Sequence, residues 1–95
     1  MGYEAEGTIH LINDTVEKSA TFKSREFVIK QTNGEHVNFM KFELVQDRVS
    51  LLDAVNVGDT AKVYFDVRGR EWQGKYFTNL HAWKIEAQQA DGNPF

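Results

Sequence analysis

The sequence predicts an all-β domain, a small barrel of five short strands with one helix between the third and the fourth. Three observations predict this fold class. Apolar and polar residues alternate through most of the chain, which is the period of a strand with one buried face. Turn signals such as Asn33-Gly34 and Val57-Gly58-Asp59 divide these runs into segments of strand length. Only one stretch, 47–55, carries apolar residues at helical spacing.

The first two predicted strands lie in the N-terminal third of the chain. The first runs from Ala5 to Ile12, and Gly7 inside it indicates a bulge or a tight bend. The polar segment from Asn13 to Ala20 is predicted to be a loop. The second strand runs from Thr21 to Gln31.

The hairpin between the second and third strands decides which basic side chains face outward. Asn33-Gly34 predicts a type I′ turn, because both central residues of that turn need positive φ. The third strand then runs from His36 or Val37 to about Val45. Phe27 and Phe39 are expected to be core residues. The outward face of the two strands nevertheless stays open, because Phe27 competes for the core with the alternate set of residues. If Phe22, Val28, Met40 and Phe42 point inward, three basic residues project outward: Lys23, Arg25 and Lys41.

The helix and the fourth strand are predicted with clearer patterns. Asp47 can cap a helix that extends to Val55, with an apolar stripe formed by Val49, Leu52 and Val55. The fourth strand runs from Thr60 to Val67, and its inward set is Ala61, Val63, Phe65 and Val67.

The fifth strand, Lys75 to Glu86, has an ambiguous apolar pattern. Leu80 and Ala82 are in one register, whereas Trp83 and Ile85 are in the other, so we expect a bulge or burial on both faces. Trp83 has apolar neighbours, which favours a core position. A polar loop is predicted to join this strand to the fourth through Gly69 to Gly74.

This last loop concentrates the side chains expected of a nucleic-acid surface. Aromatic rings stack on bases, and cations follow the phosphates. Trp72 is predicted at the loop tip. The residues on either side of it supply the cations and a second aromatic ring: Arg68, Arg70, Lys75 and Tyr76. From Lys62 to Lys84 there are five basic and two acidic residues, a local charge of +3, although the whole chain has a net charge of −3.

The composition excludes several other classes of site. The chain has 95 residues, enough for one domain, and no cysteine. Its three histidines lack the spacing of a helical metal site, and no nucleophile or phosphate-binding motif is present, so we expect no metal, no cofactor and no enzyme activity. No apolar run is long enough to span a membrane, and no signal peptide is seen, which favours the cytoplasm.

The predicted order of strands and helix matches the five-stranded Greek-key barrel called the OB-fold, which binds oligonucleotides or oligosaccharides. Another small barrel or half of a sandwich is the alternative. The segment from Val57 to Glu86, with the pattern Arg-x-Trp-Gln-Gly-x-x-Phe…Ala-Trp-x-x-Glu, resembles bacterial single-stranded DNA-binding proteins. It is closer still to a related family of small, uncharacterised bacterial OB-fold proteins. The barrel domain is predicted at 1–87, followed by a flexible tail at 88–95.

The end of the tail resembles the same proteins, whose acidic tip closes with Pro-Phe and recruits replication and repair enzymes. The corresponding residues here are Asp91, Pro94 and Phe95, although Gly92 and Asn93 stand where that family carries acids. The resemblance therefore implies a binding site for DNA-processing partners. A terminal Phe can fill an apolar pocket while its carboxylate pairs with a basic rim.

Together these observations predict a protein that binds single-stranded DNA with little sequence specificity, in replication, recombination or repair. A single barrel offers a short site, so we expect a homodimer or a higher oligomer. Two alternatives stay open. The net negative charge favours an OB-fold module that binds proteins and no nucleic acid, and stacking by itself does not separate DNA from RNA.

Overall fold

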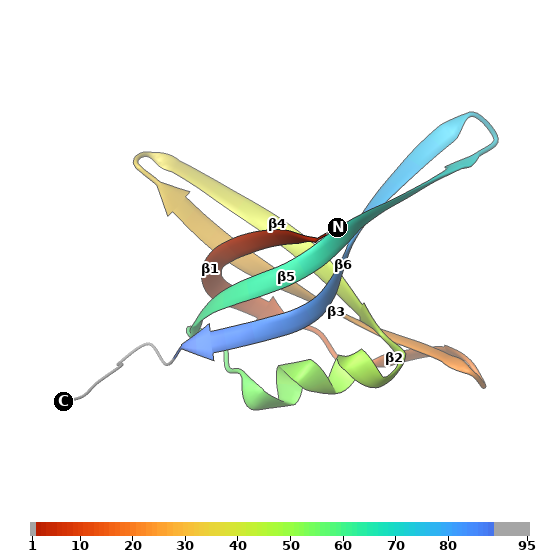
Figure 1. Ribbon diagram of the computed structural model, residues 1–95, viewed down its shortest axis with the longest axis horizontal. Helices are drawn as coiled ribbons and strands as arrows, with labels where there is room; N and C mark the ends of the chain where they lie inside the picture. Colours follow the sequence, from red (N-terminus) through yellow and green to blue (C-terminus); the bar gives the residue numbers. More distant parts are fainter. Residues whose placement is uncertain (1, 89–95) are drawn as a thin grey trace.

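The computed structural model describes residues 2–88, which form a closed barrel of five strands with a helix at one end (Figure 1). The strands pair in the order β1-β5-β6-β4-β3-β2, and a further pairing of β1 with β3 closes the barrel. β2 lies outside the barrel and pairs only with β3. The elements are β1 Tyr3–Ile12, β2 Val16–Ser19, β3 Phe22–Asn33, β4 His36–Val45, η1 Gln46–Ala54, β5 Thr60–Trp72 and β6 Lys75–Gln88. This arrangement confirms the predicted all-β barrel with its helix between the third and fourth barrel strands.

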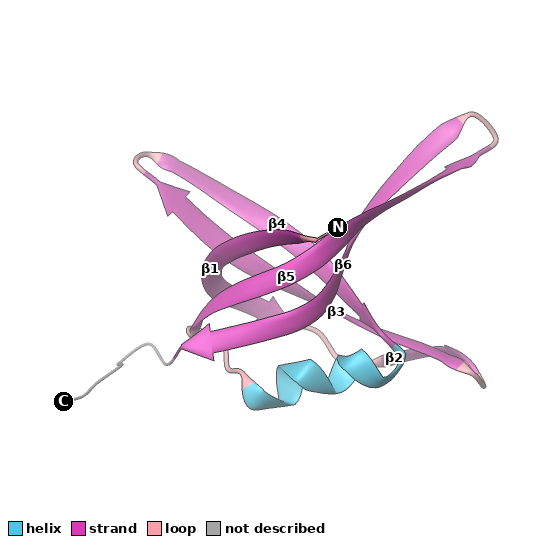
Figure 2. Cartoon of the chain, viewed as in Figure 1, coloured by secondary structure: helices cyan, strands magenta, loops and turns pink. Residues whose placement is uncertain are grey.

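Two predicted loops contain strands. The polar segment Asn13 to Ala20 includes β2, which forms a hairpin with the start of β3. The predicted loop Gly69 to Gly74 is almost all strand, because β5 and β6 stay paired as far as Trp72 and Lys75. The result is a two-stranded ribbon, residues 67–80, that projects from the barrel (Figure 2).

The predicted type I′ turn at Asn33-Gly34 is not observed, whereas a turn of this type occurs elsewhere in the chain. Asn33 pairs with His36, so the turn between β3 and β4 consists of Gly34-Glu35, and only Gly34 has positive φ. Positive φ at the first central residue alone is the pattern of a type II′ turn. The type I′ pattern occurs at Gln73-Gly74, where φ is 52° and 77°.

The barrel core consists of the inward residues of all five strands. In β3 these are Phe27 and Ile29, and in β4 they are Phe42 and Leu44, so Phe27 is correctly predicted as a core residue. Phe27 pairs directly with Phe42 across the two strands, with ring centres 5.3 Å apart. In β5 the core residues are Ala61, Val63 and Phe65, whereas Val67 is 47% exposed because it lies beyond the barrel.

The helix η1 closes one end of the barrel, as Figure 2 shows. It is a 3-10 helix, and Val49, Leu52 and Val55, three residues apart, are buried against the core. A spacing of three matches the three residues per turn of this helix type. Asp47 is not the cap: the N-cap position is Val45 and has no side-chain cap. Within residues 2–88 no helix is long and apolar enough to cross a membrane.

A bulge in β6 resolves the ambiguous pattern of this strand. The register against β5 shifts between Tyr64 and Phe65, so that Tyr64 pairs with Lys84 and Phe65 with Ala82. Trp83 is the extra residue between these pairs. Ala82 faces the core before the bulge, and Ile85 packs against the core after it. The predicted bulge is confirmed, whereas Trp83 is 38% exposed and not a core residue.

Candidate nucleic-acid interface

The ribbon formed by β5 and β6 beyond the barrel has two chemically different faces. Residues that pair directly across two antiparallel strands lie on the same face. The pairs Arg68–Asn79, Arg70–Phe77 and Trp72–Lys75 therefore share one face, here called the ribbon face. The intervening pairs, Gly69–Thr78 and Glu71–Tyr76, share the opposite face. Four of the residues predicted to bind nucleic acid thus lie together: Arg68, Arg70, Trp72 and Lys75.

The side chains of the ribbon face are available to a ligand. Trp72 is 58% exposed, next to the two-residue turn. The guanidinium of Arg70 lies 5.7 Å from the ring centre of Phe77, which is a cation–π contact. Among residues 2–88, no acidic side chain forms an ion pair with Arg68, Arg70 or Lys75. A shallow pocket at the base of this face is lined by Arg68, Gly69, Arg70, Phe77, Asn79 and His81.

Tyr76 lies on the other face of the ribbon, although the sequence places it close to Trp72. Its hydroxyl donates a hydrogen bond to Oε2 of Glu71 at 3.3 Å, and its side chain is 75% exposed. A base stacked on Trp72 is therefore separated from Tyr76 by the backbone of the ribbon. Phe77, which was not among the residues predicted to bind nucleic acid, lies beside Arg70 instead.

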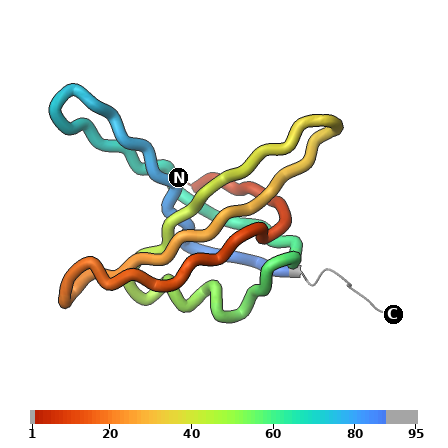
Figure 3. The backbone as a smooth tube through the Cα atoms, turned by 180° about the vertical axis from the view of Figure 1, so that it is seen from behind, coloured from red at the N-terminus to blue at the C-terminus, as the bar shows by residue number. Residues whose placement is uncertain are grey.

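A groove separates the ribbon from the hairpin of β3 and β4. β4 and β6 pair at Glu43 and His81 and then diverge toward their two hairpin ends, as Figure 3 shows from behind. The groove is lined from β4 by Phe39 to Glu43, from β6 by Thr78 to Leu80, and by Glu26. At the point where the strands meet, His81 Nε2 lies 3.3 Å from Glu43 Oε1.

The outer face of β3 and β4 brings a further cation and a further ring to this side of the barrel. Lys41 pairs with Val28 and faces outward, with its Nζ 3.7 Å from Glu26 Oε2. Phe39 is 53% exposed, and its ring centre lies 5.0 Å from that of His10. The expectation that Phe39 is a core residue is therefore wrong, because the buried set of β4 is the alternate one.

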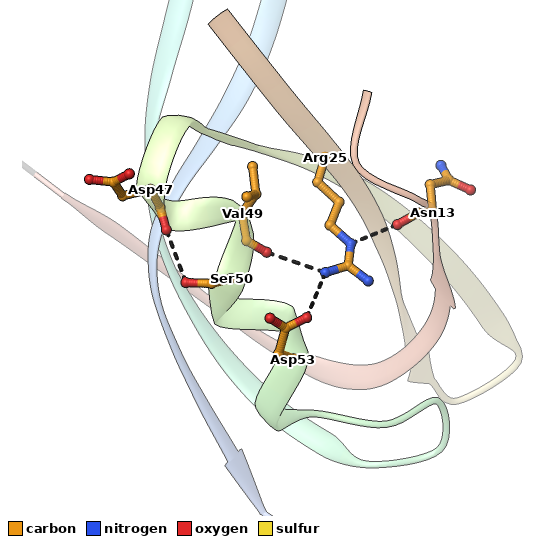
Figure 4. A network of polar contacts seen from close by, with 6 residues as sticks. All are labelled: Asn13, Arg25, Asp47, Val49, Ser50 and Asp53. Atoms are coloured by element: carbon orange, nitrogen blue, oxygen red, sulfur yellow. Dashed lines mark hydrogen bonds and ion pairs between the residues drawn. The ribbon is translucent and has the colours of Figure 1, made fainter. Parts of the chain in front are cut away.

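Arg25 lies on the inner side of β3, at the end of the barrel that η1 closes (Figure 4). Its Nε donates to the backbone oxygen of Asn13 at 2.8 Å, and its Nη1 donates to the backbone oxygen of Val49 at 3.3 Å. The same Nη1 forms an ion pair with Asp53 Oδ1 at 3.1 Å. The register that would project Arg25 outward does not occur, since Phe27 and Ile29 fill the core on its side of the strand.

Lys23 is also remote from the ribbon. It is half-buried near the start of β3, and its backbone N–H donates to Oε1 of Gln46 at 3.4 Å. Gln46 in turn donates to the backbone oxygen of Thr21 at 2.9 Å, so its side chain fastens the start of η1 to β3. The structure thus separates the predicted residues into a group around the ribbon and a pair, Lys23 and Arg25, beside the helix.

The wall formed by β1, β5 and β6 carries three groups with shifted pKa. A hydrogen bond to Glu4 and the charge of that carboxylate raise the pKa of Lys62. The pKa of Tyr64 is raised chiefly because its hydroxyl donates to Glu86 at 2.8 Å. The same bond, followed by a hydrogen bond from Lys84, lowers the pKa of Glu86. Each pKa shift favours the ionisation state that makes these contacts: the charged form of Lys62 and Glu86 and the neutral form of Tyr64.

Two further kinds of site were considered in the sequence analysis, a metal site and a partner-binding tail. Within residues 2–88 no group of three or more His, Cys, Asp or Glu side chains is placed to hold a metal ion. The predicted partner-binding residues, Asp91, Pro94 and Phe95, lie outside the described residues.

The fold is similar to solved structures of OB-fold proteins. The mitochondrial single-stranded DNA binding protein Rim1 from S. cerevisiae has a TM-score of 0.77 at 12% identity, with 94% of this chain and 96% of that chain covered. The dimeric N-terminal domain of PriB from Thermoanaerobacter tencongensis has a TM-score of 0.65 at 15% identity, with 90% and 93% covered. The small single-stranded DNA-binding protein from Streptomyces coelicolor has a TM-score of 0.58 at 18% identity, with 97% of both chains covered.

At these identities the likeness establishes the OB-fold. No curated protein sequence matches the chain. Residues 4–86 match the family model described as a domain of unknown function, DUF3127, and the chain therefore belongs to that family.

Proposed function

We propose that this protein binds single-stranded DNA with little sequence specificity, and that the ribbon face is the centre of the binding site. The observation that carries the proposal is the separation of the two ribbon faces. The cations Arg68, Arg70 and Lys75 lie with Trp72 and Phe77 on one face, while the acid Glu71 lies on the other. A face with exposed rings, and with cations that have no ion-pair partner among residues 2–88, suits both parts of a single strand, the bases and the phosphates.

The path of the strand follows from the shape of the site. A base stacks on Trp72 near the turn, and the neighbouring phosphates meet Arg70 and Lys75. The strand then continues along the groove between β4 and β6 toward Lys41 and Phe39. The likeness in fold to two single-stranded DNA-binding proteins, Rim1 and the one from Streptomyces coelicolor, supports this proposal.

Lys23 and Arg25 are not assigned to the binding site in this proposal. The guanidinium of Arg25 already contacts two backbone oxygens and a carboxylate, so a phosphate would have to displace these contacts. Tyr76 is assigned to the opposite face of the ribbon. The proposed site therefore consists of the ribbon face together with Lys41 and Phe39.

The cellular part of the proposal rests on the resemblance of the sequence. We expect the protein to act in the cytoplasm in DNA replication, recombination or repair. We also expect Asp91, Pro94 and Phe95 to recruit a DNA-processing protein. Truncation after Gln89 should then leave DNA affinity unchanged or higher and abolish capture of the partner in a pull-down. Capture that persists after truncation would contradict the assignment of the tail.

A tryptophan-fluorescence titration with an unstructured poly-thymidine oligonucleotide tests the proposal. The chain has two tryptophans, so Trp72→Phe leaves only Trp83 as a reporter. We expect quenching of the wild type at low salt, weaker quenching at moderate salt, and loss of most of the quenching in Trp72→Phe. If neither the fluorescence nor the anisotropy of a labelled oligonucleotide responds at low salt, the protein-binding alternative is favoured. The same titration with a poly-uridine oligonucleotide compares RNA with DNA.

A further inference from the structure

An acidic residue, Asp66, lies at the base of the ribbon face, and the proposed DNA site gives it no role. Asp66 pairs with His81 one step before Arg68 pairs with Asn79, so it lies on the same side of β5 and β6 as the ribbon face. It is half-buried, and its partner His81 lines the pocket that Arg68, Phe77 and Asn79 also line. A carboxylate here repels phosphates. Its position therefore calls for a different contact with the strand.

Asp66 and Arg68 carry opposite charges and yet do not pair with each other. Residues two positions apart in a strand are separated by about 6.6 Å and point to the same side. Within residues 2–88 neither side chain forms an ion pair or a hydrogen bond. A guanidinium only donates hydrogen bonds and a carboxylate only accepts them. A flat group with two acceptors on one edge and two donors on the next can therefore bridge the two side chains.

Guanine is the base that has both of these edges. Its O6 and N7 are adjacent acceptors, and Arg commonly contacts them in a bidentate manner. Its N1–H and its N2 amine are adjacent donors, which the two oxygens of one carboxylate can accept. Adenine, cytosine and thymine do not carry such a pair of neighbouring donor groups. The ring of Phe77, which is 41% exposed, lines the same pocket and offers a surface on which the base can pack.

We propose that this pocket takes one guanine of the bound strand, with Arg68 at its O6 and N7 and Asp66 at its N1–H and N2 amine. The inference rests on the proposed function and adds one base-selective position to that site. The other contacts, with phosphates and with the ring of Trp72, do not depend on the base, so the sequence specificity of the whole site stays low. Asp66 weakens the attraction for every strand and strengthens binding only where a guanine occupies the pocket.

Anisotropy titrations of the full chain with short poly-thymidine oligonucleotides that carry one central replacement test this inference. A good bidentate contact discriminates between bases by about 5- to 150-fold. Because only some registers of the strand place the central base in the pocket, we expect guanine to raise the affinity by about fivefold over thymine. Both 7-deazaguanine, which lacks N7, and hypoxanthine, which lacks the N2 amine, should lose much of this gain. Equal affinity for central guanine and thymine would overturn the inference and leave the proposed function standing, whereas no binding of any oligonucleotide would overturn both.

Asp66→Asn tests the carboxylate itself. The substitution keeps the shape of the side chain and removes its charge, so the fold should persist by circular dichroism. We expect the affinity for unmodified poly-thymidine to stay the same or rise, and the preference for guanine to be lost. The matched control is Glu71→Gln, which removes the same charge from the opposite face of the ribbon and should leave the preference unchanged. A preference for guanine that survives Asp66→Asn, or one that is lost in Glu71→Gln alone, would overturn the inference.

Discussion

Replacement of Trp72 by alanine is the most direct perturbation of the proposed DNA site. The side chain is 58% exposed and lies at the last residue pair before the turn, so its removal should change the stability of the barrel little. Stacking of one base on an aromatic side chain contributes about 1–3 kcal/mol. At about 1.4 kcal/mol for each tenfold change, the affinity for a poly-thymidine oligonucleotide should fall about 5- to 150-fold.

The ribbon itself supplies a matched control for this experiment. Tyr76 is adjacent to Lys75, the cross-strand partner of Trp72, and is 75% exposed, but it lies on the opposite face. Tyr76→Ala should therefore change the affinity by less than about twofold, as for a surface substitution without ligand contact. Fluorescence anisotropy of the labelled oligonucleotide at fixed salt measures both variants. An equal or larger loss with Tyr76→Ala would refute the assignment of the two faces, because it would place the bound strand on the side of Tyr76.

Three further substitutions test the charge, the core and the turn. Arg70→Gln should reduce the slope of log affinity against log salt by about 0.7, the value for one phosphate contact of a single strand. An unchanged slope in anisotropy titrations would remove Arg70 from the site. Arg25→Met should destabilise the fold by about 2–3 kcal/mol, because its three contacts with Asn13, Val49 and Asp53 are lost. That corresponds to a drop in Tm of about 10–20 °C, and a variant with wild-type Tm would contradict the structural role of Arg25. Gln73→Asn should raise stability in urea by about 0.5–1 kcal/mol, because Asn tolerates the left-handed φ of 52° better; a lower midpoint would contradict this.

The barrel was predictable from the sequence where a strand has one buried face. Ala61, Val63 and Phe65 alternate with polar residues because β5 covers the core there, and the pattern gives the correct inward set. The helix was predictable for a similar reason, since the spacing of Val49, Leu52 and Val55 matches its buried side. In both elements the buried residues must be apolar, so apolar residues recur in the sequence with the period of the strand or of the helix.

The ribbon was not predictable as strand, because beyond the barrel it has no core to cover. From Arg68 to Trp72 the residues are polar on both faces apart from Trp72, so the alternation that identifies a strand is absent and the segment resembles a loop. The sequence did not identify Gln73-Gly74 as the two central residues of the turn. Once the turn is placed there, the strand register follows from it: Arg70 pairs with Phe77, and Tyr76 lies on the face opposite Trp72. A one-residue error in the turn would exchange the two faces.

Trp83 shows a different limit of sequence reasoning. Its neighbours Ala82 and Ile85 both face the core, although strict alternation would put one of them outside. The sequence therefore indicates a bulge somewhere between them. It does not indicate which residue is extruded, because that depends on how β5 pairs with β6 across the bulge. The observed register extrudes Trp83, which turns a predicted core residue into part of an exposed wall.

The net charge of −3 is compatible with DNA binding because the cations of the ribbon lie away from the acidic barrel. Residues 67–80 contain three basic residues and one acid, a charge of +2, so the rest of the chain has a charge of −3 − 2 = −5. The segment from Val67 to Trp72 extends about 20 Å beyond the barrel, at about 3.3 Å per residue. The Debye length at physiological salt is about 8 Å, so the acidic barrel is largely screened at the tip of the ribbon. At low salt the same acids act over a longer distance. A bound strand should therefore lose less affinity between low and moderate salt than the cation count alone predicts, and charge-neutralising substitutions on the far side of the barrel should steepen the salt dependence.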